Sequence, residues 1–429
     1  MKYALPLVCT LLAISLSAQN PVPAPAQNSP ILILGATAHL GNGQVIANSA
    51  IGFENGKLTL VADATTIRID RSKYKTVYDA SGKHVYPGFI APLTNLGLVE
   101  IEAARATVDY SDIGQYNPNL RAIIAYNTDS DVIPTVRSNG VLLAQTTPQG
   151  GTIAGASSIV QLDAWNWEDA AYRTDDGIHL NWPQPQTFSG FGSDNPGMRK
   201  NEQYEKDVLA IRRFFEEAQA YAKQSNPATK NQRFEAMRDL FAQKNTLFIH
   251  TGNAKTIQEA VLFAESFGLQ KVVCGAEDAW MLTDFLKKHN TPVIIGKTQS
   301  LPAREDEAVD QTFKSAAILH QAGVLFAFSN DGFWQQRNLS FQAGQAVGFG
   351  LPKEAAVSAL TLHTAKILGI DGSCGSLETG KDATLFISEG DALDMRTCKV
   401  TAAFIQGRSI SLDNKHKQLQ QRFEKKYRQ

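Results

Sequence analysis

Short apolar runs separated by turn residues dominate the first part of the chain. Residues 31–86 contain three such stretches, ILILGATAHL, SAIGFENGKLTLVA and KTVYDASGKHVY, bounded by Gly, Asn and Asp. This pattern is typical of antiparallel strands joined by turns. The same texture returns in residues 370–412, in GSLETGKDATLFIS and KVTAAFIQGRSISL. We therefore expect β-structure at both ends of the chain.

The middle of the chain, residues 87–369, has a different pattern. Apolar runs of four or five residues alternate with amphipathic stretches, as in a parallel sheet with helices outside it. Ile257, Ala260, Val261 and Ala264 fall at helical spacing, for example, and Asn253 is placed to cap that helix. The apolar runs that we expect to form strands include residues 141–145, 247–250, 271–274, 292–295 and 324–328.

Two segments depart from this alternation. Residues 163–197, rich in Trp, Asp, Gly and Pro, follow neither period and suggest a long insertion or lid. Residues 413–429 form a basic amphipathic stretch in which Leu419, Phe423 and Tyr427 share one helical face. We expect a helix docked on the domain surface there, in preference to a membrane or nucleic-acid role.

The first residues are typical of a secretory signal. Lys2 supplies a positive start, residues 5–16 an apolar run, and Ser15-Leu16-Ser17-Ala18 a small-residue exit. We expect residues 1–18 to be a signal peptide and residues 19–30 to be a Pro/Ala-containing linker, so the protein is predicted to be secreted or periplasmic. The apolar run is shorter than a spanning helix requires, and no later segment qualifies, so no membrane span is expected.

Composition and charge limit the classes of partner that the protein is expected to bind. A formal net charge of -1, with 43% hydrophobic and 19% charged residues, describes an ordinary globular protein and offers no chain-wide footprint for nucleic acid. After the predicted cleavage three cysteines remain, an odd number for an exported protein. Either Cys374 pairs with Cys398 and leaves Cys274 alone, or all three are packed thiols.

Four motifs in order along the chain resemble the amidohydrolase superfamily, in its imidazolonepropionase-like branch. They are GKHVYPGFI at residues 82–90, LFIHTGNAKTI at 247–257, AGV through FSND at 322–331, and TLHTAKILG with GSLETGKDA at 361–383. The resemblance implies a fold of the α/β class. It consists of a (β/α)₈ TIM-like barrel over residues 87–369 with a small β-sandwich domain built from both ends of the chain, residues 31–86 and 370–412.

The first-strand metal ligands of the family are altered in this sequence. The family pattern after Pro-Gly-Phe-Ile is Asp-x-His-x-His, whereas this chain has Ala-Pro-Leu-Thr-Asn at 91–95. Leu93 and Asn95 therefore occupy the two histidine positions. Leucine has no lone pair, and zinc prefers nitrogen, sulfur or carboxylate to a carboxamide oxygen. A two-metal site is not expected to assemble.

A smaller set of ligand types remains. The resemblance places His179 at the fourth strand, His250 at the fifth, Cys274 at the sixth and Asp331 at the eighth. All four are acceptable zinc ligands, so at most one zinc ion is expected, and the alternative is none. Each residue also has a structural interpretation: hydrogen-bonded histidines, a packed thiol, and an aspartate that caps a turn.

Two functional hypotheses concern the barrel, and a third is a structural domain that uses the basic tail, residues 414–429, for attachment. In the first, the barrel is catalytically silent or altered and serves as a binding or partner subunit. It would take a small-molecule ligand, and it would form a homo-oligomer or pair with an intact amidohydrolase. In the alternative, the protein is a mononuclear zinc hydrolase of a non-peptide C–N bond, in an amide or cyclic amide, with Asp331 as general base.

Overall fold

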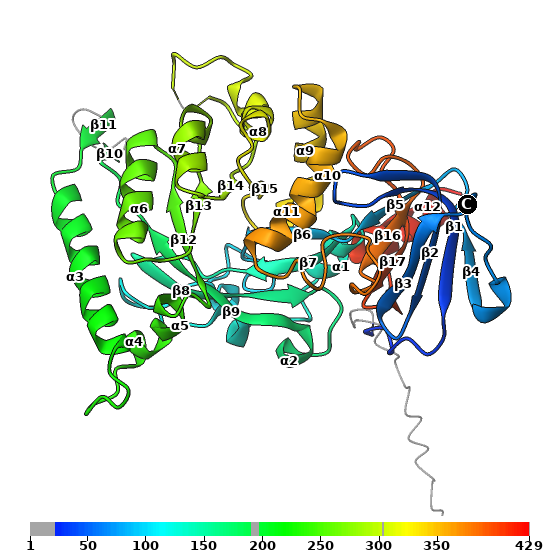
Figure 1. Ribbon diagram of the computed structural model, residues 1–429, viewed down its shortest axis with the longest axis horizontal. Coiled ribbons are helices and arrows are strands. Elements are labelled where there is room, and N and C mark those ends of the chain that lie inside the picture. Colours follow the sequence, from blue (N-terminus) through cyan, green and yellow to red (C-terminus); the bar gives the residue numbers. More distant parts are fainter. Residues whose placement is uncertain (1–21, 190–196, 303, 429) are drawn as a thin grey trace, which may run out of the picture.

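The computed structural model describes residues 22–189, 197–302 and 304–428, which fold as two β-sheet units with most helices around the larger one (Figure 1). The predicted signal peptide, residues 1–18, lies outside the described residues, as does the first part of the predicted linker.

The smaller unit is an eight-stranded sheet to which both ends of the chain contribute. Its strand order is β18-β17-β16-β5-β1-β2-β3, with β4 also paired to β1. Side chains alternate along β1, so Ile33 packs in one apolar cluster with Phe404 while Leu32 packs in another on the opposite face. The strands are β1 (Ile31–His39), β2 (Val45–Glu54), β3 (Lys57–Asp63), β4 (Thr76–Asp79), β5 (His84–Pro87), β16 (Leu385–Ser388), β17 (Val400–Ile405) and β18 (Arg408–Ser409).

The larger unit is a nearly closed barrel. Its strand order is β15-β14-β13-β12-β9-β8-β7-β6, and the end strands β15 and β6 lie beside each other. The expected fold class, a TIM-like barrel with a second β-domain, is confirmed. The strands are β6 (Phe89–Thr94), β7 (Val141–Thr146), β8 (Ile153–Gln161), β9 (Ala171–Asn181), β12 (Thr246–Thr251), β13 (Lys271–Gly275), β14 (Val293–Ile295) and β15 (Phe326–Phe328).

One barrel strand runs against the others. β8 pairs antiparallel with both β7 and β9, so the chain passes from β7 to β9 without the helices of two regular βα units. The interpretation of residues 163–197 as an insertion or lid is therefore wrong in its central part. That segment contains α2 (Trp167–Ala170), the barrel strand β9, and β10 (Gln186–Ser189), which pairs antiparallel with β11 (Gly197–Lys200). Asp175 and Asp176 interrupt the apolar pattern of β9, so the pattern alone did not reveal the strand, but His179 does lie on the fourth barrel strand, as the resemblance implied.

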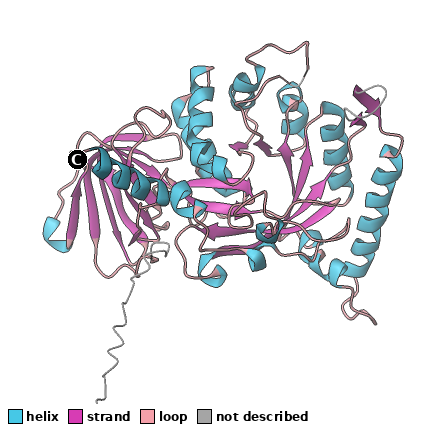
Figure 2. Cartoon of the chain, turned by 180° about the vertical axis from the view of Figure 1, so that it is seen from behind, coloured by secondary structure: helices cyan, strands magenta, loops and turns pink. Residues whose placement is uncertain are grey.

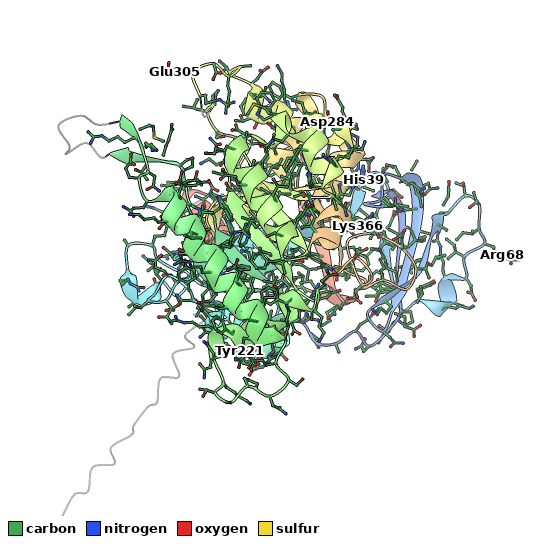
Figure 3. All side chains as sticks on the ribbon, turned by 60° about the vertical axis from the view of Figure 1, so that its left-hand side comes forward. His39, Arg68, Tyr221, Asp284, Glu305 and Lys366 are labelled. Carbon is green, nitrogen blue, oxygen red and sulfur yellow. The ribbon has the colours of Figure 1, made fainter. Side chains whose placement is uncertain are left out.

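Helices cover the outside of the barrel. Leu247 and Ile249 of β12 point outward into a cluster with Ile211 and Phe215 of α3, and Figure 3 shows α3 in front of the barrel with Tyr221 near its C-terminal end. Asn253 caps α6 as expected, because its side chain accepts a hydrogen bond from the Lys255 backbone N–H. The remaining helices are α1 (Val132–Arg137), α3 (Tyr204–Ala222), α4 (Gln232–Ala236), α5 (Arg238–Phe241), α6 (Ala254–Ser266), α7 (Thr283–Lys288), α8 (Gln311–Ala322), α9 (Leu339–Gly348), α10 (Lys353–Leu360), α11 (Leu362–Ile367) and α12 (Lys415–Tyr427).

The interior of the barrel is a packed core and not a pore. Phe248 of β12 lies in one buried cluster with Ile90, Leu143, Ile159 and Ile294, which come from four other strands. Because side chains alternate along a strand, His250 shares the inward face of Phe248. The core fills the lower part of the barrel, so polar side chains gather above it, at the C-terminal ends of the strands.

The two units meet through a buried polar cluster. His39 of β1 hydrogen-bonds Glu354 of α10 through Nδ1 (2.8 Å) and His84 through Nε2 (3.1 Å). Tyr86 stacks on the His39 ring at 4.3 Å and donates its hydroxyl to Asp391 at 3.1 Å. These contacts fix the small sheet against the barrel.

Two expectations about the whole chain can be compared with the structure. Cys274, Cys374 and Cys398 are all free thiols, and the first two are buried, which agrees with the packed-thiol alternative and not with a Cys374–Cys398 disulfide. Within the described ranges, no helix is both long and apolar enough to cross a membrane.

Candidate functional site

A cavity of about 980 Å³ opens at the C-terminal ends of the barrel strands. This is the end at which barrels of this type place their active sites. Its floor is formed by residues at or just beyond six strand ends, and its rim by the loops at residues 102–111 and 147–150. The floor residues are Leu93, Asn95, Asn181, His250, Gly275, Gly296, Ser329, Asn330 and Asp331.

Leu93 and Asn95 lie in this cavity wall, where the resemblance placed them. Leu93 has a φ of 55°, a conformation that costs a non-glycine residue about 1–2 kcal/mol, and its backbone N–H donates to Gln145 Oε1 at 3.2 Å. Asn95 is buried, and its Oδ1 has no hydrogen-bond partner among the described residues. An amide oxygen left in that state costs about 1–3 kcal/mol unless a ligand or water donates to it.

His179 and His250 form a direct pair. His179 Nδ1 lies 2.9 Å from His250 Nε2, and the His179 ring stacks on Phe248 at 4.9 Å. Burial lowers the pKa of His250 to about 4, and burial together with the neighbouring His250 lowers the pKa of His179 well below its ordinary value. Both rings are therefore neutral at pH 7, and one donates its N–H to the other. His250 is half-buried and lines the cavity, whereas His179 is fully buried behind it and its Nε2 has no partner among the described residues.

Cys274 is a packed thiol in this structure. It pairs in register with His250 across β12 and β13, but it is 1% exposed and belongs to the apolar barrel core. Burial raises the pKa of its thiol well above the ordinary value, so the thiolate that binds metal is disfavoured.

Asp331 lies at the outer edge of the cavity. Its side chain is 74% exposed, and Oδ2 lies 3.4 Å from Lys297 Nζ. It shares the cavity with His250, as the sequence predicted. Its solvated position beside a lysine does not favour the metal-binding role that the family pattern implies.

The four predicted ligands therefore do not converge on one point. His179 and His250 are brought together, while Cys274 faces the core and Asp331 faces solvent. Over the described part of the chain, no group of three or more His, Cys, Asp or Glu side chains lies in a position to hold a metal ion. Zinc sites need three or four such ligands, so the residues present do not fit the expected zinc ion.

A buried polar network beside the cavity floor escaped the sequence analysis. Asp176 accepts hydrogen bonds from Gln145 Nε2 at 2.7 Å and from Ser157 Oγ at 2.8 Å. Burial raises the pKa of Asp176 to about 6 despite these bonds. Since Gln145 also accepts from the Leu93 backbone, the network supports the strained end of β6. Strand alternation would have found Asn181, which shares a face with His179, but the bulged course of β8 and β9 hid Asp176.

Comparisons with known proteins agree on the family. The model of the amidohydrolase family matches residues 180–410, more than half of the chain. No curated protein matches the sequence significantly.

Solved structures show the same fold. An amidohydrolase from Thermotoga maritima MSB8 has a TM-score of 0.77 at 21% identity, covering 89% of this chain and 99% of its own. An adenosine deaminase from Xanthomonas campestris with bound zinc has a TM-score of 0.56 at 14% identity, covering 94% and 99%. Molinate hydrolase has a TM-score of 0.54 at 15% identity, covering 90% and 95%. Together with the family match over residues 180–410, these findings show that the chain belongs to the amidohydrolase family.

Proposed function

We propose that this protein binds a small polar molecule at the mouth of its barrel and has lost the two-metal hydrolysis of its family. The observation that carries the proposal is the state of the first-strand positions. Leu93 and Asn95 line an open cavity at the family's catalytic end, and the buried Asn95 Oδ1 lacks a donor among the described residues. Buried polar groups are normally hydrogen-bonded, so this oxygen points to a ligand with N–H or O–H groups.

The rest of the cavity wall supports a polar ligand. Asn181 donates its Nδ2 to the Gly151 carbonyl at 2.8 Å, which holds its amide in place at the cavity floor. His250 is neutral at pH 7, so its ring can hydrogen-bond a ligand without the cost of an unpaired buried charge. Glu102, Arg105 and Asp331 add charges of both signs at the cavity. Amides and cyclic amides, which combine donors and acceptors, match this set.

One observation supports a second function. His250 and Asp331 line the same cavity, as a mononuclear zinc hydrolase of a non-peptide C–N bond would require. Such an enzyme needs at least one further ligand, which the described residues do not supply in this arrangement. We therefore rank it below ligand binding.

The proposal also includes the location of the protein and its assembly with other subunits. The charged start, apolar run and small-residue exit of residues 1–18 support a secreted or periplasmic location. A barrel without its family's metal ligands can still act as the binding or partner subunit of a homo-oligomer or of a pair with an intact amidohydrolase, because fold alone does not carry catalysis.

The test is a thermal-unfolding screen of acylated amines and cyclic amides, run on protein dialysed against a chelator and again with added zinc. We expect at least one compound to raise the melting temperature equally in both states. Asn95→Leu should abolish that shift, while Asn28→Leu, at an exposed position in the N-terminal segment, should keep it. A shift that needs zinc would favour the hydrolase, and no shift with any compound would refute the proposal.

A further inference from the structure

The C-terminal helix α12 carries an apolar face that is largely uncovered. Leu419, Phe423 and Tyr427 follow one another at intervals of four residues and so share one side of the helix. Their exposed fractions rise along the helix, from 40% through 51% to 78%. Single exposed apolar residues are common on surfaces, but three in a row on one helical face mark an interaction surface.

Only the beginning of α12 is anchored to the barrel. Asn414, its N-cap, donates to Ser138 Oγ at 3.0 Å, and Lys415 forms an ion pair with Asp131 at 2.7 Å. The His416 ring then meets Trp334 edge-on at 5.7 Å. No residue of α12 is buried, and Figure 2 shows the helix on the outside of the molecule, close to the C-terminus. A helix of 13 residues is marginal in water without packing, so its second half needs a partner surface.

The charge of this helix indicates what kind of partner surface it contacts. Residues 415–428 hold six cationic side chains and one carboxylate, a net side-chain charge of +5 in a chain whose total is -1. Arg422 and Lys426 border the apolar face, because each lies three residues beyond one of its members. With Lys425, they have no ion-pair partner among the residues that the structure describes. A second copy of α12 would bring the same positive charge, which disfavours pairing of two such helices.

We propose that α12 attaches the protein to an anionic lipid bilayer surface. Leu419, Phe423 and Tyr427 would enter the boundary between headgroups and acyl chains, and Arg422 and Lys426, which border this face, would reach the lipid phosphates. Basic amphipathic helices with aromatic and leucine residues on the apolar side bind in this way. The attachment is peripheral and separate from the barrel cavity, so it does not depend on the proposed ligand.

The experiment is co-sedimentation of the purified protein with vesicles. One set contains phosphatidylcholine alone and the other phosphatidylcholine with phosphatidylglycerol. We expect binding to the second set only, weakened by salt. Arg422→Glu with Lys426→Glu, and separately Phe423→Ser with Tyr427→Ser, should each lower the affinity at least about tenfold. These side chains are exposed, so circular dichroism should confirm that both variants remain folded.

A matched control separates local binding from overall charge. Lys223→Glu with Lys230→Glu makes the same charge change at exposed positions beyond α3 and should leave vesicle binding nearly unchanged. Equal loss in this control would overturn the proposal, as would sedimentation with neither vesicle set. A change of oligomeric state in the Phe423/Tyr427 variant, without vesicle binding, would instead identify a protein surface as the occupant and also overturn it.

Discussion

At the scale of single residues, the end of β6 is held in place by side chains of the neighbouring strands. Leu93 adopts a left-handed conformation that is held by Gln145, and Gln145 is held by Asp176. Strain of this kind persists where the surroundings determine it, and it gathers at functional sites. Because the carboxyl group of Asp176 is buried in this network, its protonation should have a measurable effect on the stability of the folded protein.

Asp176 should make stability fall as pH rises. Its folded-state pKa is about 6, above the ordinary 3.8, so between these values the folded state holds more protons than the unfolded state. The folded state is thus destabilised progressively from about pH 4 and fully above about pH 6, by roughly 3 kcal/mol at most. Asp176→Asn should remove this decrease, measured as the free energy of urea unfolding at about pH 4 and pH 7.

Asp284→Asn provides the control for this prediction, because Asp284 is exposed on α7 at the periphery of the molecule (Figure 3). That variant should retain the pH dependence of the parent. If Asp176→Asn retains it as well, Asp176 does not carry the buried proton.

At the scale of elements, one aspartate ties distant segments together. Asp163, just after β8, is fully buried and pairs with Arg137 of α1 at 2.7 Å and with Arg408 of β18 at 3.0 Å. It also accepts the Ala24 backbone N–H at 2.9 Å. The N-terminal segment, the barrel and the small sheet therefore meet at a single carboxylate.

Removing the negative charge of Asp163 should lower the free energy of unfolding. Asp163→Asn leaves two guanidinium groups to share a neutral amide, and we expect a loss of about 3–5 kcal/mol in the free energy of unfolding. Asp175→Asn breaks the exposed pair with Arg121, at 2.8 Å, and should cost no more than about 1 kcal/mol. Equal effects of the two changes in urea unfolding would show that the buried cluster has no special role.

The individual strands differ in how well the sequence could predict them. Strands with clean apolar runs, such as β12 and β13, were predictable, because both faces of a parallel barrel strand are buried. The hydrophobic pattern missed β9 because Asp175 and Asp176 interrupt it, although the resemblance had placed His179 at the fourth strand. The antiparallel course of β8 has no local signature. The family match begins at residue 180, so it leaves out β6 with Leu93, β7 and the antiparallel β8.

The candidate site likewise contains residues that the sequence predicted and contacts that it did not. Leu93, Asn95, His250 and Asp331 follow recognisable strand-end motifs, and all four line the cavity. The burial of Cys274 in the core, and the pairing of His179 with His250 in place of a common metal, depend on packing between strands that spacing along the chain does not record.

At the scale of the whole molecule, the protein combines the barrel of its family, a cavity at the C-terminal ends of the barrel strands and a cationic terminal helix. The cavity and α12 are built from different elements, so ligand binding and surface attachment can be tested separately. Both concern what the protein contacts, and neither requires the family's two-metal chemistry.

The metal content of the purified protein tests the central claim most directly. Elemental analysis after expression with added zinc should be run beside a Cys274→Ala, His250→Ala double variant. We predict far less than one zinc per chain in both proteins, because the described side chains do not form a three-ligand group. About one zinc per chain in the parent that is lost in the double variant would contradict this account and make the mononuclear hydrolase the leading function.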